Sequence, residues 1–245
     1  MGAVRSFAIQ GRQVVLPVEV RDASCAFATF AVAAGRVRRL LATGELEAAE
    51  PFPGYALCSI GAVEYRDNDL GRYNEVAIAF LVRRGAGVAV PVLGMIADLV
   101  RGRLGAYIHQ LPVTTAFSCT AGRDIWGFPK SVAHIVFADE GEQRLCTLAA
   151  DGAHVLTLSV ARGGRFRFRE ARLDAFATLH GVLRRTPFVA SGEGLGLRPG
   201  GATLTLGTHS MAAELRALGL PRRPLVSGWI QTMRARFEAA EVVGG

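Results

Sequence analysis

The sequence predicts an α+β fold that is mainly antiparallel β-sheet with a few helices. Runs of β-favouring residues outnumber helical patterns, and glycine, proline or Asp-Asn clusters bound most of them. Half of the 245 residues are hydrophobic, which is enough for a sizeable core. No repeat, low-complexity tract or long linker divides the chain. We therefore expect a single domain over residues 1–245.

Short runs rich in valine, isoleucine, threonine and aromatic residues predict the strands, because such side chains fit a pleated, half-buried surface. These runs are residues 13–20, 25–32, 55–65, 75–82, 131–138, 154–161 and 202–207.

A further run, residues 164–170, alternates strictly between arginine and phenylalanine. Arg165, Arg167 and Arg169 face one side, and Phe166 and Phe168 face the other. Alternating basic and aromatic residues could line a nucleic-acid groove. A strand with one face in solvent and the other in the core explains them more simply, so we expect such a strand here.

Helical spacing of apolar residues is scarcer. It predicts helices in residues 35–44, 93–105, 173–185 and 211–219. The last helix has a stop signal, because Gly219 ends it and Pro221 follows. Residues 188–201 are the most loop-like stretch.

Charge and motif content exclude several function classes. The net charge is +7, but the arginines are spread along the chain, so we expect no nucleic-acid partner. No apolar run reaches the ~18 residues of a membrane helix, and no secretion signal is present, so we expect a cytoplasmic protein without a membrane partner. Neither the histidines nor the four cysteines have metal-site spacing, and no nucleotide-binding motif appears. We expect no metal and no cofactor.

Lys130 is the only lysine among 28 basic residues; the other 27 are arginine. Arginine stays charged, whereas lysine can lose its proton and act as a nucleophile. A free lysine has a pKa of about 10.4, and burial in apolar surroundings lowers it. The position is therefore a candidate Schiff-base lysine. The alternative is chance, in which an arginine-rich composition left one lysine over.

The residues next to Lys130 predict a rigid backbone and apolar surroundings for its side chain. Ile125, Trp126 and Phe128 precede it, and Pro129 fixes the backbone just before it. Gly127 allows the chain to turn closely. This corner leads into the predicted strand 131–138.

Three segments resemble the acetoacetate decarboxylase family. "GRDIWGFPKS" (122–131) is similar to that family's G-R-E/D motif followed by G-[YF]-P-K-K. "LGRYNEVAIAF" (70–80) resembles its G-x-Y-x-E segment, and residues 204–221 resemble its C-terminal region. The resemblance implies a β-cone or double-barrel-like fold with the lysine inside, a homo-oligomer, and a small oxo acid as substrate.

The same resemblance implies roles for individual residues. Lys130 takes the Schiff-base position, and Glu75 that of an acidic residue that places or moves protons. Phe128 and Met211 match pocket residues, and Ser131 joins them where the best-known members carry a second lysine. The alternative for Glu75 is a solvent-exposed carboxylate at a strand end.

Two further departures concern charged pocket residues. The family's second glutamate has no clear match, because Ile60 stands at the counted position and Glu64 lies four residues away. The pocket arginine expected near the N-terminus could be Arg12 or Arg21. These departures from the family pattern argue more against acetoacetate as the substrate than against Schiff-base chemistry.

Three functions remain open at this point. The first is decarboxylation of a small 3-oxo acid through Lys130, which makes the protein a carbon–carbon lyase. The second is a Schiff-base aldolase or dehydratase that joins pyruvate, or another 2-oxo acid, to an aldehyde. The third is a binding protein that has the fold without turnover.

Overall fold

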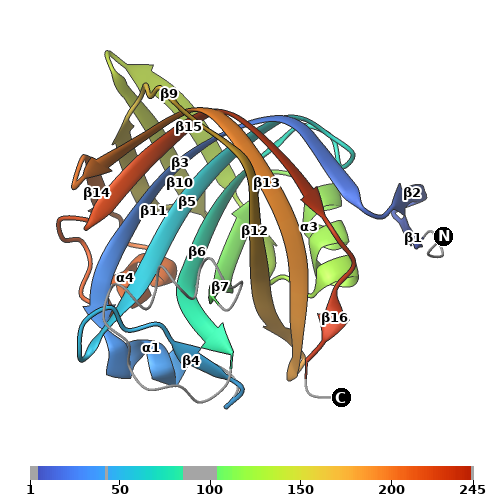
Figure 1. The fold of residues 1–245 in the computed structure, drawn as a ribbon, viewed down its shortest axis with the longest axis horizontal. Coiled ribbons are helices and arrows are strands. Elements are labelled where there is room, and N and C mark those ends of the chain that lie inside the picture. Colours follow the sequence, from blue (N-terminus) through green and yellow to red (C-terminus); the bar gives the residue numbers. More distant parts are fainter. Residues whose placement is uncertain (1–4, 42–43, 85–103, 244–245) are drawn as a thin grey trace.

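The computed structural model describes residues 5–41, 44–84 and 104–243. Seven long strands form a closed barrel in the order β6-β5-β3-β15-β13-β12-β7, and the pairing of β6 with β7 closes it (Figure 1). Their bounds are β3 Val18–Ala33, β5 Tyr55–Asn68, β6 Tyr73–Arg84, β7 Leu104–Val113, β12 Phe166–Leu179, β13 Val182–Pro199 and β15 Val226–Phe237. Neighbouring strands are antiparallel except for β7 and β12.

Shorter strands extend this barrel. They are β4 (Leu46–Ala48) on β6, β8 (Lys130–Val132) on β7, and β16 (Glu241–Val242) on β13. A separate antiparallel sheet has the order β14-β11-β10-β9. Its strands are β9 His134–Glu140, β10 Gln143–Ala150, β11 Ala153–Ala161 and β14 Ala202–Leu206.

An N-terminal hairpin projects beside α3 (Figure 1). It consists of β1 (Ser6–Ile9) and β2 (Arg12–Val15), and its turn residue Gln10 bonds to Thr120 at 2.9 Å.

Helices are few in the described part of the chain. They are α1 Ala34–Leu40, α3 Ala116–Ala121, α4 Ser210–Ala217 and the π-helix η1 Gly122–Trp126. Among the described residues, no helix is long and apolar enough to cross a membrane. The predicted α+β class with mainly antiparallel strands is confirmed, as are the helices expected in residues 35–44 and 211–219.

The barrel strands bury side chains on both faces, because they meet two separate apolar clusters. On β5, Ile60 and Ala62 belong to the cluster shared with the four-stranded sheet, whereas Val63 and Tyr65 belong to the other. Successive residues of a strand point to opposite faces, so this switch between neighbours means that both faces are covered. The second cluster also contains Phe128, close to Lys130.

Two sequence predictions are wrong in the same region. Residues 173–185 are not a helix but the adjoining ends of β12 and β13, joined at His180 and Gly181. Both of these turn residues have positive φ (53° and 77°), as a tight two-residue hairpin requires. The apolar residues on the two strands of the hairpin happen to be spaced in sequence as they would be in a helix, which explains the wrong prediction.

Residues 188–201 were expected to form a loop, but most of them lie in β13. The glycines in this stretch allow neighbouring backbone to come close to the strand. A Cβ at Gly196 would overlap the carbonyl oxygen of Gly163. The helix predicted over residues 93–105 falls outside the described residues, except that Leu104 and Gly105 begin β7.

Candidate active site

Lys130 reaches its position through a short helical connection between β7 and the parallel strand β8. Thr115 caps α3 by accepting a hydrogen bond from the Ser118 amide at 3.2 Å. The π-helix follows, and Gly127 ends it in the left-handed conformation at φ 74°. Lys130 then begins β8, parallel to β7 and in register with Leu111. This connection thus places the lysine beside β7, the strand that precedes it in the chain.

Gly122 makes room for the lysine side chain. A Cβ at this position would overlap Cδ and Cε of Lys130. The stem of the lysine therefore runs directly over the backbone of the π-helix, where only glycine leaves space. Arg123 strengthens the same corner by donating from Nη1 to the Lys130 carbonyl at 3.2 Å.

Glu75 faces the lysine from the start of β6. Its Oε2 lies 2.8 Å from Nζ of Lys130, and the two residues are only 7% and 4% exposed. At this distance the carboxylate can accept a hydrogen bond from the amine, and burial keeps water from competing for it.

Two tyrosines complete the surroundings of Glu75. Tyr65 donates its hydroxyl proton to Oε1 of Glu75 at 3.2 Å, and it pairs across the sheet with Tyr73. The two rings stack with centroids 4.5 Å apart, and Nζ of Lys130 lies 5.1 Å from the Tyr73 ring. Burial raises the pKa of both phenols well above 10, and the charge of Glu75 adds to this. Tyr65 therefore remains a donor, which holds one carboxylate oxygen while the other faces the amine.

A small cavity of about 30 Å³ opens at this cluster. Its lining is apolar and aromatic apart from the groups just described and Asn68. The lining residues are Val18, Val20, Tyr65, Asn68, Leu70, Tyr73, Glu75, Leu111, Trp126, Phe128, Lys130 and Phe237. Such a volume corresponds to about one water molecule, so a larger ligand has to displace side chains of the lining.

The structure brings together three of the five site residues expected from the sequence: Lys130, Glu75 and Phe128 all line the cavity. Ser131 does not. It follows Lys130 in a strand, so its side chain points to the opposite, exposed face. Met211 does not line the cavity either, because it lies on α4 and packs against the cluster shared with the four-stranded sheet.

The charged residues left open by the sequence also lie elsewhere. Arg12 stacks on the ring of Phe117 at 4.0 Å, and Arg21 pairs with surface carboxylates. Glu64 pairs with Arg144 at 2.7 Å, and Ile60 is buried in the core. Within the described part of the lining, Lys130 is thus the single cation and Glu75 the single carboxylate.

Sequence reasoning missed Tyr65 and Gly122. The pairing of Tyr65 with Tyr73 follows from a hairpin between β5 and β6, and alternation along both strands could have placed Tyr65 on the face of Glu75. Nothing in the residue type distinguishes Gly122, since its contact with Lys130 depends on the path of the chain through the π-helix.

Comparisons with known proteins identify the family of the chain. The family model described as acetoacetate decarboxylase matches residues 8–243. The chain belongs to the acetoacetate decarboxylase family. No match was found among curated proteins.

Solved structures support the fold of this family member. An acetoacetate decarboxylase from Legionella pneumophila has a TM-score of 0.66 at 16% identity, covering 93% of this chain and 87% of that one. The enduracididine biosynthesis enzyme MppR, in complex with pyruvate, has a TM-score of 0.61 at 15% identity, covering 92% and 90%. An acetoacetate decarboxylase-like enzyme from Sphingomonas wittichii has a TM-score of 0.57 at 14% identity, covering 93% of both chains.

Proposed function

We propose that this protein is a carbon–carbon lyase that decarboxylates a small 3-oxo acid through a Schiff base on Lys130. One observation carries the proposal: the only lysine of the chain is buried in an apolar cavity with its Nζ 2.8 Å from Glu75. A solvent-exposed lysine would carry no such implication, because it would stay protonated and hydrated.

The proposed reaction begins with a proton transfer. Glu75 accepts a proton from Nζ of Lys130, and the neutral amine attacks the ketone carbon of the oxo acid. Glu75 then returns the proton to the new hydroxyl group, which leaves as water, so that a protonated imine remains. Tyr65 keeps Glu75 oriented by its hydrogen bond to the other carboxylate oxygen.

Carbon–carbon cleavage follows from the charge of the imine. The bond between the α-carbon and the carboxylate breaks, CO2 leaves, and the electron pair moves into the enamine. The enamine carbon then takes a proton, and water hydrolyses the imine to release the ketone and the amine. An apolar lining favours this step, because it solvates a carboxylate poorly and neutral CO2 well.

The charge content of the cavity supports decarboxylation over the rival reaction. An aldolase that uses a 2-oxo acid keeps the substrate carboxylate through every step and needs a cation to hold it. Among the described lining residues, Lys130 is the only cation, and once the imine forms its charge is part of the adduct, so no separate cation is left to hold the carboxylate. A carboxylate that leaves as CO2 needs no such partner.

The aldolase or dehydratase nevertheless remains the second candidate. Ser131 replaces a second lysine, and the cavity lining has one carboxylate in the described residues, which weakens the match to acetoacetate as substrate. MppR, which shares the fold, is known in complex with pyruvate and with a condensation product of pyruvate and imidazole 4-carboxaldehyde. A binding protein without turnover is the third.

Borohydride trapping tests the shared chemistry. The protein is incubated with acetoacetate or pyruvate, reduced, digested and mapped by mass spectrometry. We expect a reduced adduct on Lys130, and the N-terminal amine is the only other primary amine that can react. Lys130→Arg, which keeps a cation but cannot form an imine, is the matched control. If no oxo acid gives an adduct on Lys130, the binding protein is favoured.

A second assay separates the two enzymes. Release of CO2 from acetoacetate is measured beside product formation from pyruvate plus an aldehyde such as imidazole 4-carboxaldehyde. Decarboxylation without condensation supports the leading proposal. Condensation without CO2 release replaces it with the aldolase.

A further inference from the structure

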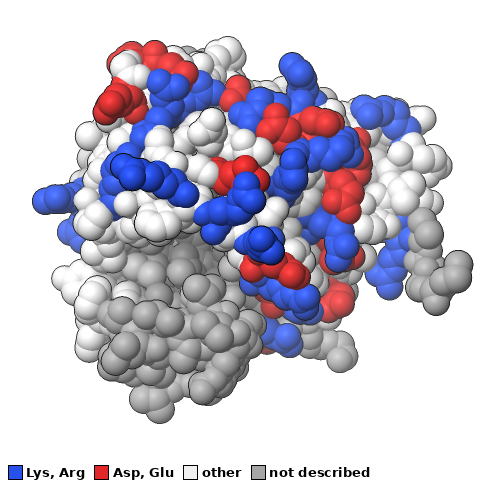
Figure 2. All heavy atoms as spheres, turned by 45° about the horizontal axis from the view of Figure 1, so that its top comes forward, with Lys and Arg blue, Asp and Glu red and all other residues white. Residues whose placement is uncertain are grey.

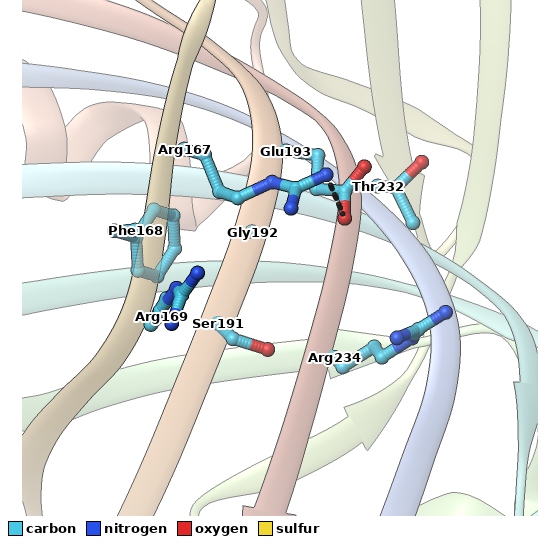
Figure 3. A pocket seen from close by; sticks show the side chains of 8 residues that line it. All are labelled: Arg167, Phe168, Arg169, Ser191, Gly192, Glu193, Thr232 and Arg234. Atoms are coloured by element: carbon cyan, nitrogen blue, oxygen red, sulfur yellow. Dashed lines mark ion pairs between the residues drawn. The ribbon is translucent and has the colours of Figure 1, made fainter.

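A second hollow lies on the barrel surface, away from Lys130. It has a volume of about 170 Å³ and spans β12, β13 and β15 (Figure 3). Its lining residues are Arg167, Phe168, Arg169, Ser191, Gly192, Glu193, Thr232 and Arg234. It shares none of them with the cavity at Lys130.

Strand register aligns three of these side chains in a row. Ser191 of β13 pairs directly with Arg234 of β15. On the other side the register shifts between Phe168 and Ala171, so that Arg169 falls in a bulge opposite Ser191. Two strand spacings, about 10 Å, therefore separate the backbones of the two arginines, with the serine hydroxyl between them. Figure 3 shows Arg169 and Arg234 on either side of Ser191.

Both arginines lack a carboxylate partner among the described residues. Arg167, by contrast, pairs with Glu193 at 3.0 Å on one margin of the hollow. The charge of Arg234 acts on Asp22. However, Arg66 already donates hydrogen bonds to both carboxylate oxygens of Asp22, at 2.8 and 2.6 Å. Those bonds from Arg66 are the main reason that the pKa of Asp22 is lowered, and the charge of Arg234 contributes less. Arg169 and Arg234 thus keep their donor capacity.

The hollow continues into a larger depression of about 510 Å³ that Arg169, Ser191 and Arg234 also line. The other arginines there are already paired: Arg21 with Asp67 and Asp69, and Arg236 with Glu238. Figure 2 shows how closely basic and acidic side chains alternate over this face of the molecule. Against that background, two unpaired guanidinium groups in one hollow are a local excess of positive charge.

We propose that this hollow binds a small organic anion with two charged ends, of the dicarboxylate class, held between Arg169 and Arg234. Each guanidinium can bind one carboxylate through paired N–H donors, and the Ser191 hydroxyl can donate to either end. The ligand is short, because Glu193 lies on one margin of the hollow and Glu170 lines the adjoining depression. A polyanion such as single-stranded nucleic acid would meet these carboxylates as it continued along the surface.

Calorimetric titration at constant ionic strength tests the proposal, with malonate, succinate, glutarate and adipate as probes and butyrate as the single-carboxylate control. We expect the best dicarboxylate to bind at least about fivefold more tightly than butyrate, because only it engages both arginines. Added salt weakens the interaction, since the site is exposed. Equal binding of butyrate and every dicarboxylate overturns the proposal.

Substitutions then locate the site. Arg169→Ala and Arg234→Ala each weaken binding of the best probe by about fivefold, whereas Arg165→Ala, an exposed arginine outside the hollow, leaves it unchanged. Circular dichroism checks that the variants fold, and Arg169→Lys, which keeps the charge, recovers part of the affinity. The idea fails if Arg165→Ala weakens binding as much as the other two. It also fails if a single-stranded oligonucleotide binds more tightly than any dicarboxylate and loses affinity in the same variants.

Discussion

Two ion pairs with the same length lie in opposite environments of this barrel. Lys130 and Glu75 are 2.8 Å apart, and their side chains are 3% and 9% exposed. Arg21 and Asp67 are also 2.8 Å apart, but their side chains are 49% and 56% exposed. Water screens the second pair and can solvate either partner alone, whereas neither member of the first pair has that alternative. The environment, not the contact distance, decides what each pair can do.

The difference explains why reactivity is expected at only one of them. A buried amine and carboxylate can exchange a proton, since each charge is costly in apolar surroundings. An exposed arginine and aspartate stay charged and serve as surface contacts. Strand β3 contributes to both environments: Val18 lines the cavity, Glu19 and Arg21 line the outer depression, and Val20 lines both.

Breaking the buried pair should produce the largest effect. Lys130→Met keeps the length of the side chain and removes its charge, which leaves Glu75 buried without its cation. We expect the free energy of unfolding to fall by about 3–5 kcal/mol, and the borohydride adduct to disappear. Denaturant unfolding measures the first effect.

The double variant Lys130→Met/Glu75→Gln is the control for that experiment. It removes both charges, so it should be more stable than Lys130→Met alone. A single variant as stable as the wild type would show that the pair is not buried as described.

Alkaline pH should give the next largest effect, because burial also disfavours ionised thiols. Desolvation raises the pKa of Cys25 and of Cys58 to about 12. Below the ordinary thiol pKa of about 8.5, the protonated thiols contribute their full stability. As the pH rises from there towards 12, the unfolded thiols ionise first, and the free energy of unfolding falls by about 1.4 kcal/mol per pH unit for each thiol.

Denaturant unfolding at a series of pH values between 8 and 10.5 measures this slope. Cys58→Ala should reduce it by the share of one thiol. A slope that stays the same in this variant contradicts the burial of Cys58.

Filling the space over the π-helix should have a smaller effect on stability but a clear one on chemistry. Gly122→Ala forces the stem of Lys130 aside, because the new Cβ would overlap it. Overpacking of this kind destabilises by about 1–3 kcal/mol. We expect adduct formation on Lys130 to slow by at least about tenfold, since the amine moves away from Glu75.

Gly61→Ala is the matched control for Gly122→Ala. Gly61 lies in β5, and a Cβ there meets nothing within 4 Å. It should form the adduct at the wild-type rate. If Gly122→Ala does so too, the lysine stem has more room than the structure gives it.

Removing the exposed pair should have the smallest effect. Arg21→Ala leaves Asp67 and Asp69 in water, which solvates them as well as the arginine did. Thermal unfolding of this variant should match that of the wild type within error. A loss close to that of Lys130→Met would show that burial does not distinguish the two pairs.

The sequence alone determined the class of the fold and named Lys130 and Glu75 as candidate site residues. Composition isolates Lys130 as the one lysine, and the β-rich runs along the chain predict a mainly antiparallel sheet. The motif around Lys130 and the motif around Glu75 are each a contiguous segment, so the sequence was sufficient to find them.

Only the tertiary structure decided which other residues join that pair and which remain outside. Phe128 was expected from the motif, but Tyr65 reaches Glu75 through the register of β5 on β6, and Gly122 meets the Lys130 stem through the path of the π-helix. Met211 lies outside because α4 packs on a different cluster. The Tyr65 and Gly122 contacts are close in sequence, but backbone geometry sets them: the β5–β6 register places Tyr65, and the helical connection between β7 and β8 places Gly122.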